Sequence, residues 1–241
     1  MTPATSSTAV FQASLDSGGT ASSTNRPTFA GTANSFALVQ LSARFSGVDA
    51  TLPLGQTIAD SNGPWSLLTG PLAQGLYTVT TVVTPSNGSP SSPFLVGANG
   101  LIAIDTTPPR VVGVFATPGR DQVYVNFRDD LSGLSLASLL DRSNYTLTGP
   151  GNSVGVHPSS VTLLAAGGLP TDVQGVLLTI PNVRSRHFLR NLRIKGLGIT
   201  DAAGNALASD FHGSVITIAN GRASGNLVVK LGGHAPKGPR R

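Results

Sequence analysis

The chain has 241 residues, of which 11% are charged and 39% hydrophobic, and its formal net charge is +5. It contains 29 glycines and 17 prolines, but no glutamate and no cysteine. Typical globular proteins contain about 25% charged residues, and helix surfaces are usually built from Glu, Lys, Arg and Ala. The composition therefore argues against a helical protein and favours an all-β fold. The lack of cysteine excludes disulfides, thiolate catalysis and cysteine zinc sites.

Positive charge is concentrated in the second half of the chain. Residues 16–105 contain two arginines and four aspartates, a net charge of −2, whereas fourteen cations and seven aspartates from Arg110 onward give +7. Residues 1–14 lack the basic and apolar regions of a signal peptide, and we expect them to form a flexible N-terminal segment. No apolar run approaches the roughly 18 residues that a membrane span needs. The chain is therefore expected to be either cytoplasmic or part of a longer exported protein.

The first segment alternates short strand patterns with turns. Strands are predicted at residues 28–33, 36–45, 65–67, 75–84 and 101–104. In the longest of them, alternate residues from Tyr77 to Val83 share one face, because side chains in a strand alternate between the two faces of the sheet. Turn signals lie at residues 60–64 and 86–89. This spacing predicts one β-sandwich over residues 15–105.

Four pieces of this segment, in this order, resemble one bacterial Ig-like repeat of large surface adhesins. They are PTFAGTA at 27–33, ADSNGPWSL at 59–67, LAQGLYTVT at 72–80 and DTTPP at 105–109. The match covers residues 15–109. It implies an Ig-like sandwich in which Trp65 and Tyr77 are core or rim residues. We expect both rings to be packed, with their polar tips hydrogen-bonded.

A proline-rich joint follows at residues 105–109. Proline holds φ near about −65° and has no N–H, and the residue before a proline is pushed into an extended conformation. We therefore predict a stiff linker at residues 106–109 between two domains. Each domain has about 100 residues, enough for its own core.

The second segment has a similar texture. Strands are predicted at residues 111–115, 122–127, 144–148, 175–180, 192–199 and 215–218, with one or two helical turns at 134–140. Residues 123–127, 144–148 and 192–207 resemble the Ig-like domains of bacterial surface and S-layer-associated proteins. The resemblance implies a second sandwich over residues 110–220, so that the chain is a tandem pair of Ig-like, Greek-key β-sandwiches. Residues 221–241 are expected to form a basic, largely disordered tail in which residues 227–231 can add an edge strand.

Aspartates near the joint and in later turns are the candidate metal ligands: Asp105, Asp129, Asp130 and Asp201. Two interpretations stay open. Aspartate in a turn hydrogen-bonds nearby backbone N–H groups and needs no metal, which is the interpretation that we favour. Alternatively, their carboxylates hold Ca²⁺ and stiffen the joint, since oxygen ligands suit that ion. No EF-hand loop is present, and glutamate, a common bidentate calcium ligand, is missing.

A basic stretch in the second domain is the other candidate site. Its cations are Arg184, Arg186, Arg190, Arg193 and Lys195. They fit either a solvated loop and outer sheet face, which we favour, or a site for a polyanion such as a glycan. Only Phe188 supplies an aromatic ring there, so base stacking is unsupported and we do not expect nucleic acid as a partner.

Nothing in the sequence indicates catalysis. The four histidines have no metal-ligand spacing, and no nucleophile motif precedes a helix. We therefore expect a non-catalytic structural or adhesion module that acts as a spacer, with no cofactor unless the aspartates hold Ca²⁺. The alternative is a polyanion- or glycan-binding module that uses the basic surface of the second domain. The resemblance implies that the chain belongs to a longer exported protein at the cell surface or outside the cell. Its expected partners are other domains of that chain, a surface glycan or another protein.

Overall fold

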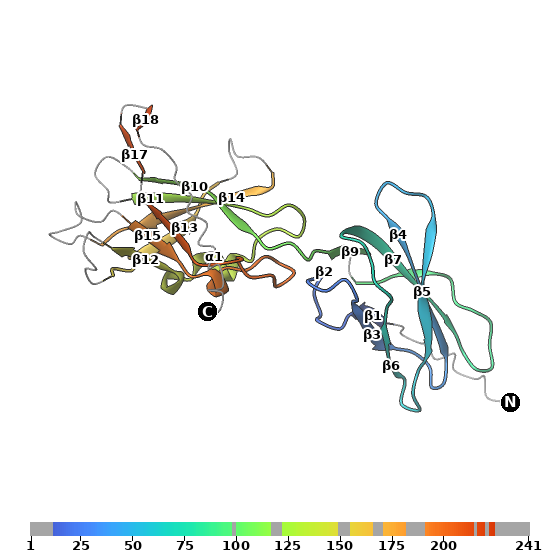
Figure 1. Ribbon diagram of the computed structural model, residues 1–241. Coiled ribbons are helices and arrows are strands. Elements are labelled where there is room, and N and C mark those ends of the chain that lie inside the picture. Colours follow the sequence, from blue (N-terminus) through green and yellow to red (C-terminus); the bar gives the residue numbers. More distant parts are fainter. Residues whose placement is uncertain are drawn as a thin grey trace, which may run out of the picture. The chain divides into compact units, whose positions relative to one another are not determined.

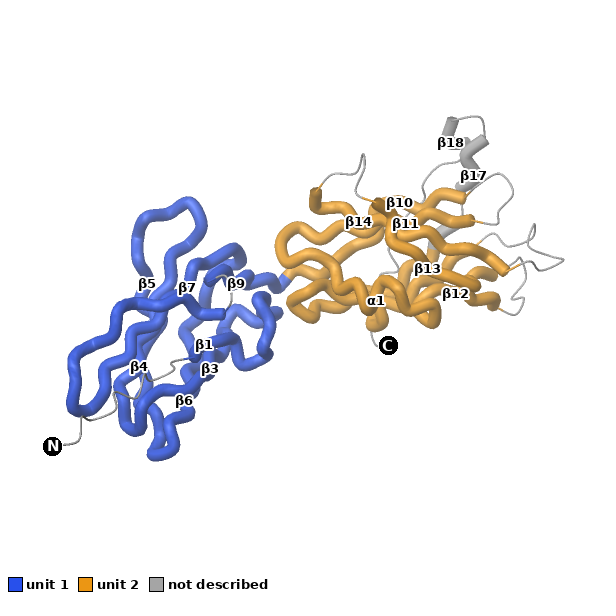
Figure 2. The backbone as a smooth tube through the Cα atoms, turned by 180° about the vertical axis from the view of Figure 1, so that it is seen from behind, with its two compact units in different colours: residues 1–106 blue, residues 107–241 orange. Residues whose placement is uncertain are grey.

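The computed structural model describes residues 12–97, 100–116, 122–148, 155–165, 171–181, 191–214, 216–219 and 222–224 (Figure 1). The chain divides into two compact units, Met1–Thr106 and Thr107–Arg241 (Figure 2). Each unit is built from two β-sheets that enclose an apolar core, so the predicted all-β sandwich fold is confirmed.

The strands of unit 1 form one small and one large sheet. The small sheet has the order β1 (Gln12–Leu15), β3 (Thr28–Thr32), β6 (Pro64–Leu68). The large sheet has the order β2 (Ala21–Ser22), β9 (Leu101–Ile104), β7 (Gly75–Thr84), β4 (Leu38–Phe45), β5 (Thr51–Ile58), and β8 (Phe94–Leu95) also pairs with β7. The described pairs are antiparallel except β2 with β9. Strands β1, β3 and β6 are separated along the chain by strands of the large sheet, so the chain crosses repeatedly between the two layers of the sandwich.

The core of unit 1 lies between these sheets. Phe29 from the small sheet and Val79 and Ile102 from the large sheet are fully or almost fully buried. The alternation predicted for β7 is confirmed, because its residues from Tyr77 to Val83 are buried at every second position.

Tyr77 and Trp65 are both core residues, as predicted, but their polar tips differ. The Tyr77 hydroxyl donates to the Ala73 carbonyl at 2.9 Å, and burial raises the pKa of this hydroxyl. A tyrosine near the start of this strand that bonds backbone a few residues upstream is typical of Ig-like sandwiches. Within the described residues Trp65 Nε1 has no hydrogen-bond partner, so the expectation of a bonded indole was wrong.

Unit 2 uses a second arrangement of the same architecture. One sheet has the order β13 (Ser160–Leu163), β14 (Val173–Thr179), β11 (Gln122–Arg128), β10 (Arg110–Ala116), β17 (Ile216–Ala219), β18 (Arg222–Ser224). The other sheet has the order β12 (Tyr145–Thr148), β15 (Asn191–Ile194), β16 (Phe211–Ser214). In Figure 1, β10, β11 and β14 lie above β12 and β15. A four-strand and a three-strand sheet in this order match the constant-type Ig topology, with β17 and β18 added to the first sheet.

The core of unit 2 lies between its two sheets. Val125 and Phe127 of β11 meet Tyr145 and Ile194 of the facing sheet, and all four are buried. Helix α1 (Leu136–Leu140) covers one end of the core with Leu139, which confirms the short helix predicted there. Two short 3₁₀ turns are also present. Turn η1 (Arg142–Asn144) directly precedes β12, and turn η3 (Gly196–Gly198) follows β15.

The structure also contains elements that the sequence did not predict. Strand β5 carries Pro53 and Gly55, which interrupt its pattern, and β13 has only four residues, which is too short for a clear strand signal. Strand β1 begins at Gln12 and buries Leu15, so ordered structure starts before residue 15. Strand β18 pairs with β17 beyond residue 220, within the segment expected to be a tail. The candidate edge strand at 227–231 lies outside the described residues.

Candidate functional site

Asp129 follows the end of β11 and anchors the turn that leaves it. The carboxylate is 5% exposed, and its Oδ2 accepts hydrogen bonds from the N–H groups of Leu131 at 3.2 Å and Gly133 at 2.7 Å. Gly133 has φ of 78°, a left-handed conformation that glycine adopts without strain. This is the turn-forming use of aspartate expected from the sequence.

Asp201 anchors a second turn in the same unit. It is 2% exposed, and its carboxylate accepts hydrogen bonds from the backbone N–H of Asn205 at 2.8 Å and from the Asn205 side-chain amide at 2.7 Å. The two turns are joined, because Ala202 N–H donates to Gly133 O at 2.7 Å and Leu134 forms a β-bridge with Asp201. The backbone therefore fixes the position of both aspartates relative to one another.

The structure brings Asp129 and Asp201 together. A carboxylate oxygen of one lies within 4.8 Å of a carboxylate oxygen of the other, and both side chains are buried. Two ionised carboxylates this close repel each other in a buried environment. A divalent cation compensates such a pair, and Ca²⁺ in particular takes carboxylate oxygens at about 2.3–2.6 Å. The pair can thus supply two oxygen ligands from two rigid turns.

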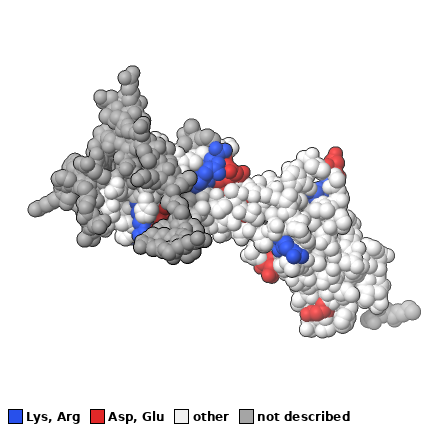
Figure 3. All heavy atoms as spheres, in the orientation of Figure 1, with Lys and Arg blue, Asp and Glu red and all other residues white. Residues whose placement is uncertain are grey.

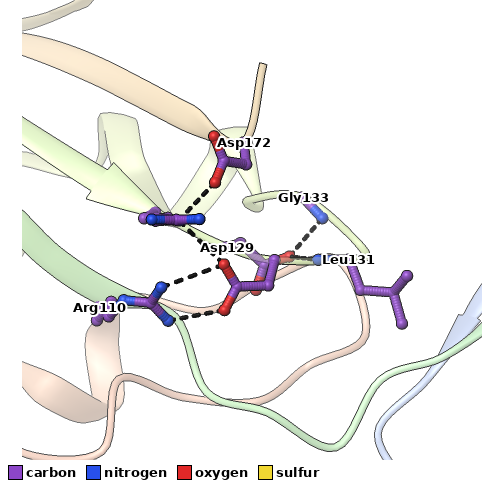
Figure 4. A network of polar contacts seen from close by, with 7 residues as sticks. Arg110, Asp129, Leu131, Gly133 and Asp172 are labelled. Atoms are coloured by element: carbon purple, nitrogen blue, oxygen red, sulfur yellow. Dashed lines mark hydrogen bonds and ion pairs between the residues drawn. The ribbon is translucent and has the colours of Figure 1, made fainter. Parts of the chain in front are cut away.

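Asp130, the neighbour of Asp129, has a different role. It accepts two hydrogen bonds from the Arg110 guanidinium, at 2.8 and 3.2 Å, and one from Arg128 Nε at 3.0 Å. The Arg110 bond is the main reason that the pKa of the Asp130 carboxyl is lowered. Arg128 also pairs with Asp172, which the sequence analysis did not single out (Figure 4). Side chains of consecutive residues at a strand end point in opposite directions. Asp129 therefore faces the buried turn, whereas Asp130 faces the arginines and belongs to their ion-pair network.

A hollow of about 300 Å³ lies beside this network, between residues 129–134 and residues 171–174 of unit 2. Asp129, Asp130 and Asp172 all line it. Arg110 and Arg128 hold two of these three carboxylates in ion pairs. The hollow is therefore an extension of the acidic turn, and its charge is partly neutralised by the flanking arginines.

Asp105 belongs to unit 1. It follows β9, its side chain is fully buried, and its N–H donates to Ser22 O at 2.9 Å, which extends the parallel pairing of β2 with β9. Next to it, the Thr106 hydroxyl donates to the Gln74 side chain at 3.2 Å. The end of unit 1 is thus tied to its own sheet up to the first residues of the joint.

The structure describes only two of the five cations proposed as a polyanion site. Arg193 pairs with Asp210, whose carboxylate also accepts the N–H of Gly196 at 2.8 Å. This backbone bond, followed by the Arg193 bond, lowers the pKa of Asp210. Lys195 is the other described cation, while Arg184, Arg186 and Arg190 lie outside the described residues.

The described surface carries few charges in the view of Figure 3, and the visible cations lie near acidic residues. Arg193 follows this pattern, because its charge is largely neutralised by Asp210. The described part of the basic stretch therefore offers less free positive charge than its sequence suggests. Among the residues that the structure describes, no helix is long and apolar enough to cross a membrane.

Comparisons with known proteins do not identify a family for this chain. No protein-family model and no curated protein matches it. Solved structures that are similar include one described as structural insight into host cell surface retention of a 1.5-MDa bacterial ice-binding adhesin (14% identity, 87% of this chain and 64% of that chain, TM-score 0.35). Others are the BSP domain of a biofilm associated protein (12%, 89% and 27%, TM-score 0.27) and the FN1–FN3 domains of chicken CNTN1 (9%, 82% and 65%, TM-score 0.32).

The chain spans less than two thirds of the length of each of these three structures. At identities of 14% or less and TM-scores of 0.35 or less, we draw nothing about function from the likeness. The fold assignment rests on the strand orders and cores described above.

Proposed function

We propose that this chain is a non-catalytic spacer and adhesion module of a longer bacterial surface protein, in which Ca²⁺ stiffens the joint between the two sandwiches. The observation that carries the proposal is the Asp129–Asp201 pair, whose buried carboxylate oxygens lie within 4.8 Å of each other in the unit that follows the linker. A spacer needs stable modules and a stiff connection, and sheet pairing with core packing supplies the first of these.

Asp105 is the proposed third ligand. It precedes Arg110, the first residue of β10, by five residues, and Arg110 pairs with Arg128 immediately before Asp129. Five extended residues span at most about 18 Å, so the connection allows the Asp105 carboxylate to reach the pair. Pro108 and Pro109 restrict the backbone of the linker that joins Asp105 to β10. An ion held by residues on both sides of the linker would reduce its remaining freedom.

Thermal unfolding in about 2 mM CaCl₂ and in excess EDTA tests this proposal. A ligand that binds only the folded state raises stability by mass action, so we expect Ca²⁺ to raise the melting temperature by roughly 5 °C. The variants Asp129→Asn and Asp201→Asn should lose the response. Asp49→Asn, on an exposed loop of unit 1, should keep it. Equal melting in calcium and EDTA would leave both aspartates as turn formers and remove the proposed ion.

The spacer role has a separate readout. The chain has no cysteine, so Asn87→Cys in unit 1 and Ala208→Cys in unit 2, both exposed, give two unique spin-label sites. Electron–electron double resonance should show a distance distribution that narrows on adding Ca²⁺. A distribution of unchanged width, together with a raised melting temperature, would mean that the ion stabilises unit 2 without stiffening the joint.

A further inference from the structure

Unit 2 contains a second surface hollow, whose lining residues are different from those of the acidic turns. Its volume is about 460 Å³, within the range of about 300–1,000 Å³ that small-ligand sites occupy. Three parts of the chain meet there: the start of η1, the residues that lead into β13, and Pro181, two residues after the end of β14. The lining residues are Asp141, Arg142, Ser143, His157, Pro158, Ser159 and Pro181.

Hydrogen bonds between these segments hold the walls in place. Ser159 donates to Thr179 O from its N–H at 2.8 Å and from its hydroxyl at 3.0 Å, which ties the approach to β13 to the end of β14. Arg142 Nη1 donates to Ser159 O at 2.9 Å, which ties η1 to the same wall. The hollow is therefore preorganised by backbone contacts and does not depend on a ligand for its shape.

Arg142 provides cationic donors at this hollow. A guanidinium has five N–H donors in a planar fork. Within the described residues, Arg142 donates from one of its nitrogens, Nη1, to the Ser159 carbonyl. The free edge matches the two oxygens of a carboxylate. Asp141 also lines the hollow, but its oxygens accept the N–H of Ser143 at 2.9 Å and its hydroxyl at 3.0 Å.

The local charge remains positive despite Asp141. The Ser143 backbone N–H is the main reason that the pKa of Asp141 is lowered, with smaller contributions from the Ser143 hydroxyl, Lys195 and Arg142. One ionised carboxylate thus faces two cations. An anionic ligand is favoured over a cationic one.

His157 indicates what else the ligand must carry. Its Nδ1 lies 2.7 Å from Tyr145 O, and a carbonyl oxygen only accepts, so Nδ1 holds the proton and donates. In the neutral ring Nε2 is then an acceptor and can accept a hydrogen bond from a ligand hydroxyl or N–H. Pro158 and Pro181 add apolar ring surface to the walls. The hollow offers an anion contact, an acceptor for a hydroxyl group and an apolar floor for a ring.

We propose that this hollow binds one carboxylate-bearing sugar of an acidic polysaccharide, with Arg142 holding the carboxylate and His157 accepting a sugar hydroxyl. No Phe, Tyr or Trp lines the hollow, so stacking of nucleic-acid bases is not supported there. The site does not use the calcium ligands.

Calorimetric titration of the intact chain in EDTA tests this site with four probes: oligogalacturonate, neutral dextran, dextran sulfate and polyphosphate. We expect oligogalacturonate to bind and dextran not to bind. Arg142→Gln should weaken oligogalacturonate binding by about tenfold, because a charge-assisted bond is lost. Arg142→Lys keeps the positive charge but loses the planar fork of donors, so its affinity for oligogalacturonate should lie between those of the wild type and Arg142→Gln. His157→Gln should weaken binding by a smaller factor.

Two arginines provide matched controls. Arg26 in unit 1 also donates from its guanidinium to a backbone carbonyl, that of Thr69, at 3.4 Å, but no hollow described in the structure includes it. Arg193 in unit 2 is paired with Asp210. Neither Arg26→Gln nor Arg193→Gln should change binding, and Arg142→Gln should melt at nearly the wild-type temperature. Each substitution removes one positive charge, so the comparison separates the hollow from general basicity.

Three results would overturn the proposal. No binding of oligogalacturonate removes the site. Binding of all three polyanions that is equally sensitive to Arg142→Gln and Arg193→Gln indicates general attraction to a basic surface. Binding of polyphosphate, lost with Arg142→Gln, without binding of oligogalacturonate indicates a phosphate site. Because the experiment is done in EDTA, failure here leaves the calcium proposal standing, and failure of the calcium proposal leaves this one standing.

Discussion

Units 1 and 2 each enclose an apolar core between two sheets, yet they differ in how completely their buried polar side chains are hydrogen-bonded. In unit 1, Trp65 Nε1 and Thr81 Oγ1 are buried without a hydrogen-bond partner among the described residues. In unit 2, the Asn144 amide donates to Ser138 O at 2.9 Å and to Gly198 O at 2.8 Å. The buried Tyr145 hydroxyl donates to Leu139 O at 2.7 Å.

Charges follow the same division. Unit 1 has one described ion pair, Arg44 with Asp49 on an exposed loop, whereas the other described ion pairs all belong to unit 2. An unsatisfied buried polar atom costs about 1–3 kcal/mol, while a satisfied one contributes modestly. We infer that unit 1 is held mainly by apolar packing and sheet pairing. Unit 2 adds a frame of polar contacts that also builds its candidate sites.

The largest expected effect tests how far unit 1 depends on close sheet packing. A Cβ at Gly31 of β3 would lie 1.9 Å from Gln12 O of β1 and 2.7 Å from Trp65 Cζ2 of β6. The obstacle is the backbone of a paired strand, so Gly31→Ala should destabilise unit 1 by about 3 kcal/mol. Trp65 is the only tryptophan, so its fluorescence reports unfolding of unit 1 alone.

Gly70→Ala is the control, because nothing lies within 4 Å of a Cβ there. Gly31→Ala should leave the second calorimetric transition, that of unit 2, where it is. A wild-type fluorescence melt for Gly31→Ala would mean that β1 is not needed for the stability of unit 1.

Removing one hydroxyl from each core gives opposite signs if the comparison is correct. Thr81→Val replaces an unpartnered hydroxyl by a methyl of similar shape and should stabilise unit 1 by about 1 kcal/mol. Tyr145→Phe removes a buried hydroxyl that has a partner and should destabilise unit 2 by about 1–2 kcal/mol. Calorimetry, with the transition of unit 1 assigned by Trp65 fluorescence, measures both. If Thr81→Val destabilises unit 1, its hydroxyl is satisfied and the contrast between the cores fails.

The sequence predicted best those parts of the fold that depend on local alternation. The faces of β7 and β11 were readable because apolar residues recur at nearly every second position from Tyr77 to Val83 and at every second position from Val123 to Phe127. Strand β5 was missed because Pro53 and Gly55 interrupt its pattern, although β4 pairs along its length. A weak local signal can thus be overridden by a strong neighbour.

Side-chain roles were harder to predict than strands. Asp129 and Asp130 are adjacent and chemically identical in the sequence, and only the direction of each side chain at the end of β11 separates a buried turn anchor from an arginine partner. The hollow at Arg142 and His157 gave no signal, because its walls meet through contacts to Ser159 and Tyr145 that no local pattern encodes. Such sites depend on tertiary contacts between distant segments.

The smallest expected effect is a loss of stability at low pH, and we expect it in unit 2. The folded-state pKa values of Asp130, Asp141 and Asp210 are lowered, chiefly by hydrogen bonds from Arg110, the Ser143 N–H and the Gly196 N–H respectively. The unfolded chain therefore binds protons more readily at these positions. Their contribution to stability is present above the unfolded pKa of about 3.9 and is lost as the pH falls through the folded values. We expect the unit 2 transition to move down between about pH 4 and pH 2.

The acid effect is small because these carboxyl groups are partly exposed and water screens their pairs. Asp130→Asn should make the pH dependence of unit 2 shallower, since Asn keeps an acceptor for Arg110 but does not titrate. Asp49→Asn should leave the unit 2 transition unchanged, because Asp49 and its partner Arg44 belong to unit 1. If Asp130→Asn leaves the acid response at its wild-type slope, the Arg110–Asp130 contact contributes nothing to the frame. The difference between the units would then rest on the uncharged hydrogen bonds of Asn144 and Tyr145.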